Sequence, residues 1–147
     1  MTRVAWAKVE IDDAIVGQID RGLLVLLGCG KGDETTDAAL LIDKIVNLRI
    51  FENEAGKMDK SAIDLQGSLL VISQFTLFGD VSRGRRPSFD EAMKPELAEP
   101  MYDAFVSKCR GLLKTEAGRF RAHMRVTSVN DGPVTIWLDS RQLRKGA

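Results

Sequence analysis

Two long apolar runs constrain the fold of this chain more than any other feature of its sequence. The first is GLLVLLG at 22–28, and the second opens the stretch SLLVISQFTLF at 68–78. Because neither run alternates with polar residues, we expect strands that are buried on both faces. Between them, 34–48 has apolar residues at helical spacing after a start rich in acidic and hydroxyl residues. A strand, a helix and a second strand predict a parallel pair joined by a crossover.

Both ends of the chain are predicted to add antiparallel strands. Strands are expected at 4–12 and 14–19, with a pair of aspartates turning the chain at their junction. Near the other end, strands are expected at 119–129 and 133–139, on either side of Asp131-Gly132. That pair often forms the tip of a hairpin, because both residues tolerate positive φ. The sheet is therefore predicted to be mixed.

A second helix is predicted from Pro95, since apolar residues from Leu97 to Leu112 recur at helical spacing. Pro100 fits this helix only if the helix begins near it or kinks there, because proline lacks a backbone donor. A short strand is expected at 49–51. The predicted fold class is thus α/β, with strands, helix, strand, helix and strands in that order.

One domain is expected to account for the chain. At 147 residues, of which 44% are apolar, the chain can bury roughly 70% of its unfolded surface around a single core. We expect this domain to span 1–140 and a basic C-terminal tail to span 141–147. No stretch has the form of a signal peptide or a membrane span, which predicts a cytoplasmic protein that does not enter membranes.

Charge, cysteine and histidine content argue against several functions. Basic and acidic residues number 21 each, so binding of nucleic acid through bulk charge is not expected. Cys29 and Cys109 are too far apart in sequence for a zinc motif and are expected to be reduced thiols. His123 is the sole histidine, and we expect it to lie on a strand in contact with solvent. Neither a metal site nor a cofactor is predicted.

Polar residues interrupt the second apolar run and suggest a site. Ser73, Gln74 and Thr76 follow residues typical of a buried strand, and polar groups that are buried need hydrogen-bond partners. These side chains either face solvent at the strand end or line a pocket there, as is common in α/β sheets. The adjacent loop GDVSRGRRPSF favours a pocket for a phosphate-bearing substrate, because its arginines can bind phosphates bidentately.

The stretch NDGPVT at 130–135 contains a second unusual feature. Pro133 follows the turn-forming pair Asp131-Gly132 and has no N–H group to donate to a strand ladder. A simple hairpin turn does not explain why a proline stands at this position.

Taken together, these motifs resemble those of the D-aminoacyl-tRNA deacylase family. The segments GLLVLLG, NLRIFENEAGKMDKS, LLVISQFTLF, RGRRPSF, GRF and VNDGPVT occur in the family's order and at about its spacing, from Val4 to Asp139. The resemblance implies a homodimer of single-domain subunits with a three-layer α/β/β fold and a mixed sheet. It also implies hydrolysis of the ester that joins a D-amino acid, or glycine mischarged on tRNA-Ala, to the 3′ end of tRNA.

The resemblance gives the glycine-proline pair a role. In the family this pair is cis and reaches into the active site of the partner subunit. Carried over, the carbonyls of Gly132 and Pro133 would hold the amino group of the substrate and leave no room for an L side chain. A cis bond costs only about 0.5 to 1 kcal/mol before proline, against roughly 3 kcal/mol elsewhere. Asn130, Thr135 and Arg3 are expected to support this chiral gate.

Catalysis is assigned by the same resemblance to Ser73, Gln74, Phe75 and Thr76, with backbone N–H groups near the last two forming an oxyanion hole. Two mechanisms stay open: Thr76 acts as the nucleophile, or the terminal 2′-OH of the tRNA assists. The second is favoured, because the motif contains no histidine or lysine that could activate a hydroxyl. The residues expected to bind tRNA phosphates are Arg83, Arg85 and Arg86.

Two other functions are compatible with these motifs. One is a related aminoacyl-tRNA editing hydrolase with a trans glycine-proline pair and looser chirality. The other is a non-catalytic tRNA-binding protein of the same fold, although the intact SQFTL motif favours an enzyme. The sequence also departs from the family at Thr2, where glutamine is usual, and the first strand is expected to be shortened at its start.

Overall fold

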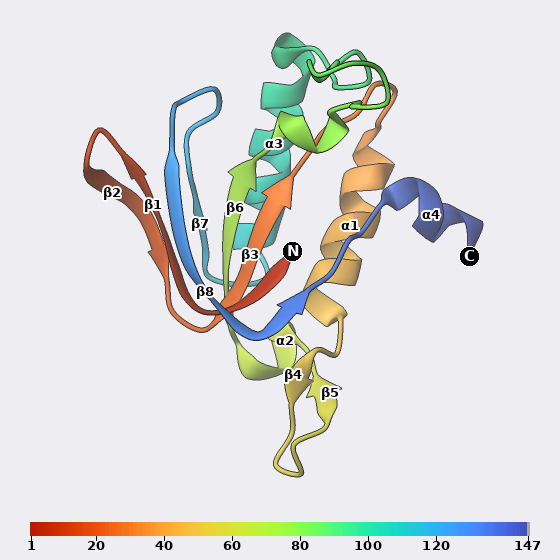
Figure 1. The fold of residues 1–147 in the computed structure, drawn as a ribbon. Helices are drawn as coiled ribbons and strands as arrows, with labels where there is room; N and C mark the ends of the chain where they lie inside the picture. Colours follow the sequence, from red (N-terminus) through yellow and green to blue (C-terminus); the bar gives the residue numbers. More distant parts are fainter. Residues whose placement is uncertain (147) are drawn as a thin grey trace.

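The computed structural model describes residues 1–146 and places a mixed sheet at the centre of an α/β domain (Figure 1). Five strands of this six-stranded sheet follow the order β2-β1-β3-β6-β7. The sixth strand, β8, also pairs with β1. The strands are β1 (Thr2–Ile11), β2 (Ala14–Ile19), β3 (Gly22–Leu27), β6 (Ser68–Ser73), β7 (Thr115–Ala117) and β8 (Arg125–Thr135), with β4 (Phe51–Glu52) and β5 (Met58–Lys60) in a separate pair. The helices are α1 (Thr35–Asn47), α2 (Ala62–Leu65), α3 (Pro95–Arg110), α4 (Ser140–Lys145) and the 3-10 helix η1 (Phe75–Phe78). Within residues 1–146, no helix is both long and apolar enough to cross a bilayer.

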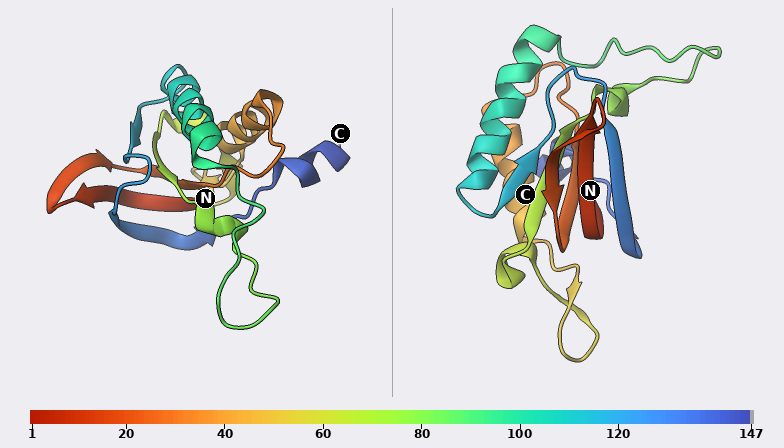
Figure 2. Two further views of the ribbon diagram at one scale, coloured as in Figure 1. Left: turned by 90° about the horizontal axis from the view of Figure 1, so that it is seen from above. Right: turned by 90° about the vertical axis from the view of Figure 1, so that its left-hand side faces the viewer.

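The predicted parallel pair is confirmed, because β3 and β6 pair in parallel along their whole length. Both strands are buried on both faces apart from Leu26, which is 38% exposed, since their other alternate side chains enter two different apolar cores. Leu23 and Val25 pack with residues of α1 and α3, which cover one face of the sheet (Figure 2). Leu24 packs on the opposite side with residues of β1 and β2. The mixed sheet is also confirmed, because β1 is antiparallel to β2, β3 and β8.

The second strand and the first helix lie where the sequence predicts them, whereas β1 begins at Thr2, two residues before its predicted start. β1 and β2 form a hairpin whose turn contains Asp12 and Asp13, both with positive φ (49° and 63°). α1 occupies the range predicted at 34–48 to within a residue at each end. Its first turn is held by the side chain of Asp37, which accepts a hydrogen bond from the N–H of Glu34 at 2.8 Å.

The strand predicted at 68–78 is too long. β6 ends at Ser73, because its partner β3 ends at Leu27 and the ladder has no further residues to pair with. The chain then forms η1, whose last residue, Phe78, packs against Gly30. A Cβ atom on Gly30 would lie 2.6 Å from the Phe78 ring, so this close approach requires glycine.

The hairpin predicted at Asp131-Gly132 is wrong. β8 runs from Arg125 to Thr135 as one strand antiparallel to β1, while residues 119–124 and 136–139 lie outside it. Asn130 pairs with Val4 and Thr135 pairs with Thr2, so β8 has more residues than β1 between these two points. The extra residues form a bulge rather than a reversal of the chain.

α3 begins at Pro95 as predicted and carries Pro100 in its second turn. Pro100 is exposed, so water can bind the carbonyl that its missing N–H leaves free. The predicted apolar stripe is wrong at both ends. Ala98 faces the core, whereas Leu97 is 63% exposed, and Leu112 lies beyond the end of α3 and is 51% exposed.

Residues 141–145 of the predicted basic tail form most of α4, and Gly146 follows as a turn. Ala147 lies outside the described residues. Arg144 forms an ion pair with the buried Asp37, and Arg141 lies 3.7 Å from Asp33. These arginines therefore neutralise acidic residues at the start of α1, where the helix dipole also favours negative charge.

Replacing Asp37 with asparagine is expected to lower the free energy of unfolding by about 2 kcal/mol at neutral pH, the usual scale for losing a charged hydrogen-bonding group. Burial raises the pKa of Asp37, but hydrogen bonds from Glu34, Ser140 and Arg144 outweigh burial and hold the pKa below its ordinary value. The folded pKa is thus below the unfolded one, which is about 3.9. The stabilisation is complete above the unfolded pKa and is lost as the pH falls through the folded pKa.

Denaturant unfolding of both proteins over a pH series checks this prediction. The difference between wild type and variant should be largest near neutral pH and should shrink below about pH 4. A difference that grows on acidification would contradict it.

Candidate functional site

A cavity of about 750 Å³ lies where β6 ends, and Ser73, Gln74 and Phe75 line it. Its other walls come from the β3–α1 connection, the loop that enters α3, and the loop that precedes β8. Two backbone hydrogen bonds join the first two of these walls, from Lys31 to Glu91 and from Met93 to Cys29, both at 2.9 Å. The cavity thus lies at the carboxyl ends of parallel strands, where α/β sheets commonly bind ligands.

The backbone at the start of η1 has two N–H groups without acceptors. The N–H of Gln74 donates to Leu27 at 2.8 Å, and the N–H of Leu77 donates to Gln74 at 3.3 Å. Between them, the N–H groups of Phe75 and Thr76 donate to no acceptor within residues 1–146. Two adjacent donors therefore remain available at the edge of the cavity.

The hydroxyl of Thr76 is not paired with a base. Its oxygen accepts a hydrogen bond from the side-chain amide of Gln74, and an amide does not take up a proton near neutral pH. Burial, reinforced by the charge of Asp33, raises the pKa of the Cys29 thiol in the cavity wall to about 11. Cys29 is therefore protonated near neutral pH and is a poor nucleophile.

His123 also lines this cavity, on the loop before β8. Its predicted exposure is confirmed, but its predicted place on a strand is wrong. Within residues 1–146, no group of three or more histidine, cysteine and carboxylate side chains is arranged to hold a metal ion.

Several residues that the sequence did not predict as site residues also line this cavity. Phe89 is one of them, and its ring makes an edge-to-face contact with the ring of Phe75, which is 55% exposed, at a centroid distance of 5.0 Å. These rings give the cavity an aromatic wall. No local signal identifies such residues, because they come from segments that are far apart in sequence. The others include Lys31, Lys94, Phe120, Arg121 and Met124.

A second cluster of predicted residues surrounds the bulge of β8. The Gly132-Pro133 peptide bond is cis, and both residues are exposed. The side chain of Asn130 spans the bulge: its oxygen accepts from the N–H of Val134 at 2.9 Å, and its amide donates to the Thr135 hydroxyl at 3.1 Å. Asn130 thus holds the two sides of the bulge together.

Arg3 supports the same bulge from the core side and is only 7% exposed. Its Nε donates to the carbonyl of Asp131 at 2.8 Å, and Nη1 donates to the carbonyl of Ile50 at 2.7 Å. Gly132 has a φ of 140°, and a Cβ atom there would lie 2.7 Å from Val134 and 3.0 Å from Arg3. Both the backbone conformation and the surrounding atoms therefore require glycine.

These two clusters do not meet within one chain. Neither Gly132 nor Pro133 lines the cavity at Ser73. Figure 1 shows β8 bending at one end of the sheet, while β6 passes into η1 at the opposite end. A single subunit thus presents the bulge and the polar strand end on separate parts of its surface.

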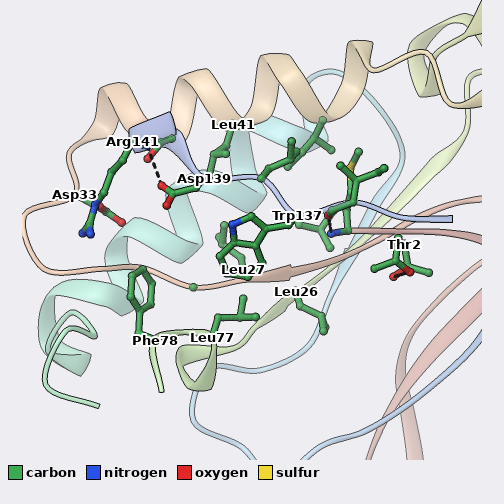
Figure 3. Close-up of a pocket in the computed structure, with 18 residues that line it drawn as sticks. Thr2, Leu26, Leu27, Asp33, Leu41, Leu77, Phe78, Trp137, Asp139 and Arg141 are labelled. Carbon is green, nitrogen blue, oxygen red and sulfur yellow. Dashed lines mark hydrogen bonds and ion pairs between the residues drawn. The ribbon is translucent and has the colours of Figure 1, made fainter. Parts of the chain in front are cut away.

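Thr135 instead borders a smaller cavity of about 440 Å³ between β3, η1 and the C-terminal segment (Figure 3). Trp137, Leu27 and Leu77 make its walls mainly apolar. At one end, the N–H of Arg141 donates to the carboxylate of its neighbour Asp139 at 2.9 Å. Asp139 is therefore used in holding the start of α4.

The three arginines proposed for phosphate binding lie on the exposed loop between η1 and α3, which projects from the domain in Figure 2. Asp80 and Ser88 close its base through reciprocal backbone hydrogen bonds of 2.7 and 2.9 Å. Gly84 at its tip has a positive φ of 68°. Within residues 1–146 no carboxylate pairs with Arg83, Arg85 or Arg86.

The fold and the site define a single-domain α/β protein with a mixed sheet and a cavity at the ends of its parallel strands. Residues 1–139 match the model of a family described as D-Tyr-tRNA(Tyr) deacylase. The chain belongs to this deacylase family.

Curated relatives agree with this assignment, and solved structures share the fold. The D-aminoacyl-tRNA deacylase of Thermosipho africanus is 53% identical over 96% of this chain and 95% of its own, and that of Thermomicrobium roseum is 51% identical over 100% of this chain and 96% of its own. A solved structure described as c-Myc DNA Unwinding Element Binding Protein is 40% identical, with a TM-score of 0.89 over 94% of this chain and 95% of its own. A solved structure described as a probable eukaryotic D-amino acid tRNA deacylase shares the fold. It is 17% identical, with a TM-score of 0.74 over 89% of this chain and 92% of its own.

Proposed function

We propose that this chain hydrolyses the ester between a D-amino acid and the 3′ end of tRNA and that its active form is a homodimer. The observation that carries the proposal is the strand end from Ser73 to Phe75, which lines a cavity in a member of the deacylase family. The products are free D-amino acid and free tRNA, and the reaction needs no cofactor. Because its substrate is tRNA, the enzyme acts in the cytoplasm.

The free N–H groups of Phe75 and Thr76 form the oxyanion hole. Attack on the ester carbonyl places negative charge on its oxygen, and two fixed donors stabilise that charge without reorganising. A donor of this kind usually contributes about 3 to 4 kcal/mol. Ser73 and Gln74 place the motif at the end of β6, and Gln74 also holds the Thr76 side chain.

The 2′-OH of the terminal ribose assists the reaction in preference to Thr76. A nucleophilic threonine needs a base within hydrogen-bonding distance, and the Thr76 hydroxyl has the Gln74 amide there instead. The protein then acts mainly by positioning the ester and stabilising its oxyanion.

The exposed bulge of β8 acts as the chiral gate of the partner subunit. Gly132 and Pro133 line no part of their own chain's large cavity, yet Asn130, Thr135 and Arg3 hold the bulge in one conformation. In the partner's cavity, the two carbonyls bind the amino group of the substrate. Main-chain atoms then exclude every L side chain regardless of its chemistry.

Glycyl-tRNA passes the same gate. Glycine has no side chain for the gate to reject, so glycine mischarged on tRNA-Ala is a second substrate.

A homodimer requires a free surface around the bulge, and β8 provides one. All residues from Arg125 to Pro133 are exposed, including Val126 and Val129, which are about 40% exposed. A second copy that packs there buries apolar side chains and also delivers the gate. The two cores on opposite faces of β3 and β6 support a three-layer α/β/β arrangement in each subunit.

The projecting loop binds the tRNA backbone. Arg83, Arg85 and Arg86 carry charge that no carboxylate within residues 1–146 neutralises. Such contacts position a nucleic acid without reading its sequence.

Release of tyrosine from D-Tyr-tRNA and L-Tyr-tRNA tests the proposed function. The purified protein is expected to hydrolyse the D substrate at least about a hundredfold faster, as for a site that excludes one enantiomer sterically. Equal hydrolysis of both substrates would point to an editing hydrolase with looser chirality. Binding of tRNA without turnover would point to a non-catalytic protein.

A further inference from the structure

The rim of the 750 Å³ cavity carries basic side chains that the fold does not use. Lys31, Lys94 and Arg121 line the cavity, each from a different one of its walls. Within residues 1–146, none of them forms an ion pair. Asp90 is the single acidic residue among those that line this cavity. The rim therefore has a net positive charge beside a largely apolar interior.

Arg121 stands at a backbone position that usually selects glycine. The N–H of Ala122 donates to the carbonyl of Arg119 at 3.2 Å, which closes a four-residue turn. Arg121 is the third residue of this turn and has a φ of 65°, whereas Phe120 before it does not have a positive φ. These signs are those of a type II turn, whose third residue is normally glycine or asparagine.

A long side chain at such a position disfavours the fold locally. Backbone conformations of this kind cluster at functional sites. Arg121 is exposed, so no packing of its side chain in the core accounts for it. Its place on the cavity rim explains an arginine at this position, if the ligand carries negative charge.

We propose that Arg121, together with Lys31 and Lys94, binds the phosphates that join the last nucleotides of the tRNA. This inference rests on the proposed deacylase function and names the part of the substrate that these residues recognise. The 3′ end of tRNA is single-stranded and carries one phosphate per nucleotide, while a guanidinium group can bind phosphate bidentately. Arg121 is thus a positioning residue, which holds the terminal ester beside Ser73–Thr76 without touching the reacting atoms.

This contact differs from that of the projecting arginines. Arg83, Arg85 and Arg86 lie on a loop that extends away from the domain, whereas Arg121 borders the cavity itself. The loop therefore serves more distant phosphates, and the rim serves those next to the reacting ester.

Kinetics of Arg121→Gly with two substrates test the inference. One substrate is D-Tyr-tRNA, and the other is 3′-O-D-tyrosyl-adenosine, which has no phosphate. For D-Tyr-tRNA, we expect KM to rise about five- to tenfold, the scale of one phosphate contact, with kcat within about twofold of wild type. The slope of log KM against log salt should fall by about 0.7, as for one single-strand phosphate. Hydrolysis of the adenosine ester should not change.

Two further variants provide controls. Arg121→Lys keeps the charge and should recover part of the lost affinity. Arg119→Gly removes the same side chain two residues away, where it does not line the cavity, and should keep the wild-type KM. Because glycine suits the turn, Arg121→Gly should unfold at the wild-type temperature or a few degrees above it, so misfolding cannot explain a raised KM.

The outcomes separate this inference from the function on which it rests. A wild-type protein that releases no D-tyrosine from D-Tyr-tRNA would contradict the proposed function. An active wild type with an unchanged KM and salt slope in Arg121→Gly would overturn the phosphate contact alone. An equal loss on tRNA and on the adenosine ester would also overturn it, because the effect would then lie in the cavity.

Discussion

Replacing Gly132 with alanine is expected to reduce hydrolysis of D-Tyr-tRNA by about a hundredfold or more, the scale on which a misplacement of 1 Å affects positioning in catalysis. The added Cβ atom would lie 2.7 Å from Val134 and 3.0 Å from Arg3, so the bulge must shift. Arg3 holds the carbonyl of Asp131 in the same bulge, and this contact would move with it. If the bulge is the chiral gate, its carbonyls then no longer fit the amino group of the substrate.

Gly56 offers a matched control for this variant. It also has a positive φ, 74°, but no atom lies within 4 Å of the position its Cβ would occupy. Gly56→Ala therefore has only the general cost of a left-handed backbone, about 1 to 2 kcal/mol, and should keep its activity. Comparable activity loss in both variants would contradict a specific role for the bulge.

Mixed dimers test whether the gate acts on the partner subunit. Phe75→Pro removes one proposed oxyanion donor at the first position of η1, where proline is well tolerated. Dimers that contain one Gly132→Ala subunit and one Phe75→Pro subunit would have one intact site, built from both chains. Random assembly should therefore restore about a quarter of the sites, as expected for a symmetric dimer. No recovery, with mixed dimers present, would show that each subunit uses its own gate.

A D-Tyr-tRNA that ends in 2′-deoxyadenosine is expected to react about a hundredfold more slowly or worse, since acid–base assistance usually contributes about 10² to 10⁴. The physical reason is the hydrogen bonding of Thr76. Its oxygen accepts from the Gln74 amide, which does not take up a proton. The Cys29 thiol in the cavity wall has its pKa raised to about 11, so it is protonated near neutral pH, and neither group replaces the ribose hydroxyl. Rates of tyrosine release, corrected for spontaneous hydrolysis of each ester, measure the effect.

Thr76→Ala is the companion experiment. It removes the hydroxyl but keeps the backbone N–H, so we expect activity within about fivefold of wild type, the scale of one neutral hydrogen bond. Loss of activity in this variant, together with normal cleavage of the deoxy substrate, would make Thr76 the nucleophile.

Local patterns were enough for the elements whose structure depends on their own residues. The apolar runs at β3 and β6 are buried on both faces as predicted, and α1 lies where its spacing predicts it. Short-range chemistry is sufficient there, because periodicity and helix-start residues act over a single turn or strand. Ser73 and Gln74 line a pocket as predicted, whereas Thr76 is exposed and does not line it.

Local patterns failed where a distant strand decided the outcome. Asp131-Gly132 has the composition of a hairpin turn, yet β1 supplies a partner on both sides of it, so β8 continues through a bulge. The strand predicted at 68–78 stops at Ser73 because β3 stops at Leu27, which the residues of β6 do not encode.

The sequence by itself determined the α/β class, the parallel pair and the chemical nature of the motifs at Ser73 and Gly132. Those features follow from residue types and their spacing along the chain. The tertiary structure alone decided which side chains share the cavity, since Lys31, Phe89 and Arg121 come from three separate segments. It also decided that one chain keeps its bulge away from its own cavity. The physical reason is that sheet pairing and side-chain packing bring together residues that are far apart in the sequence. The separation of two residues along the chain does not reveal such a contact.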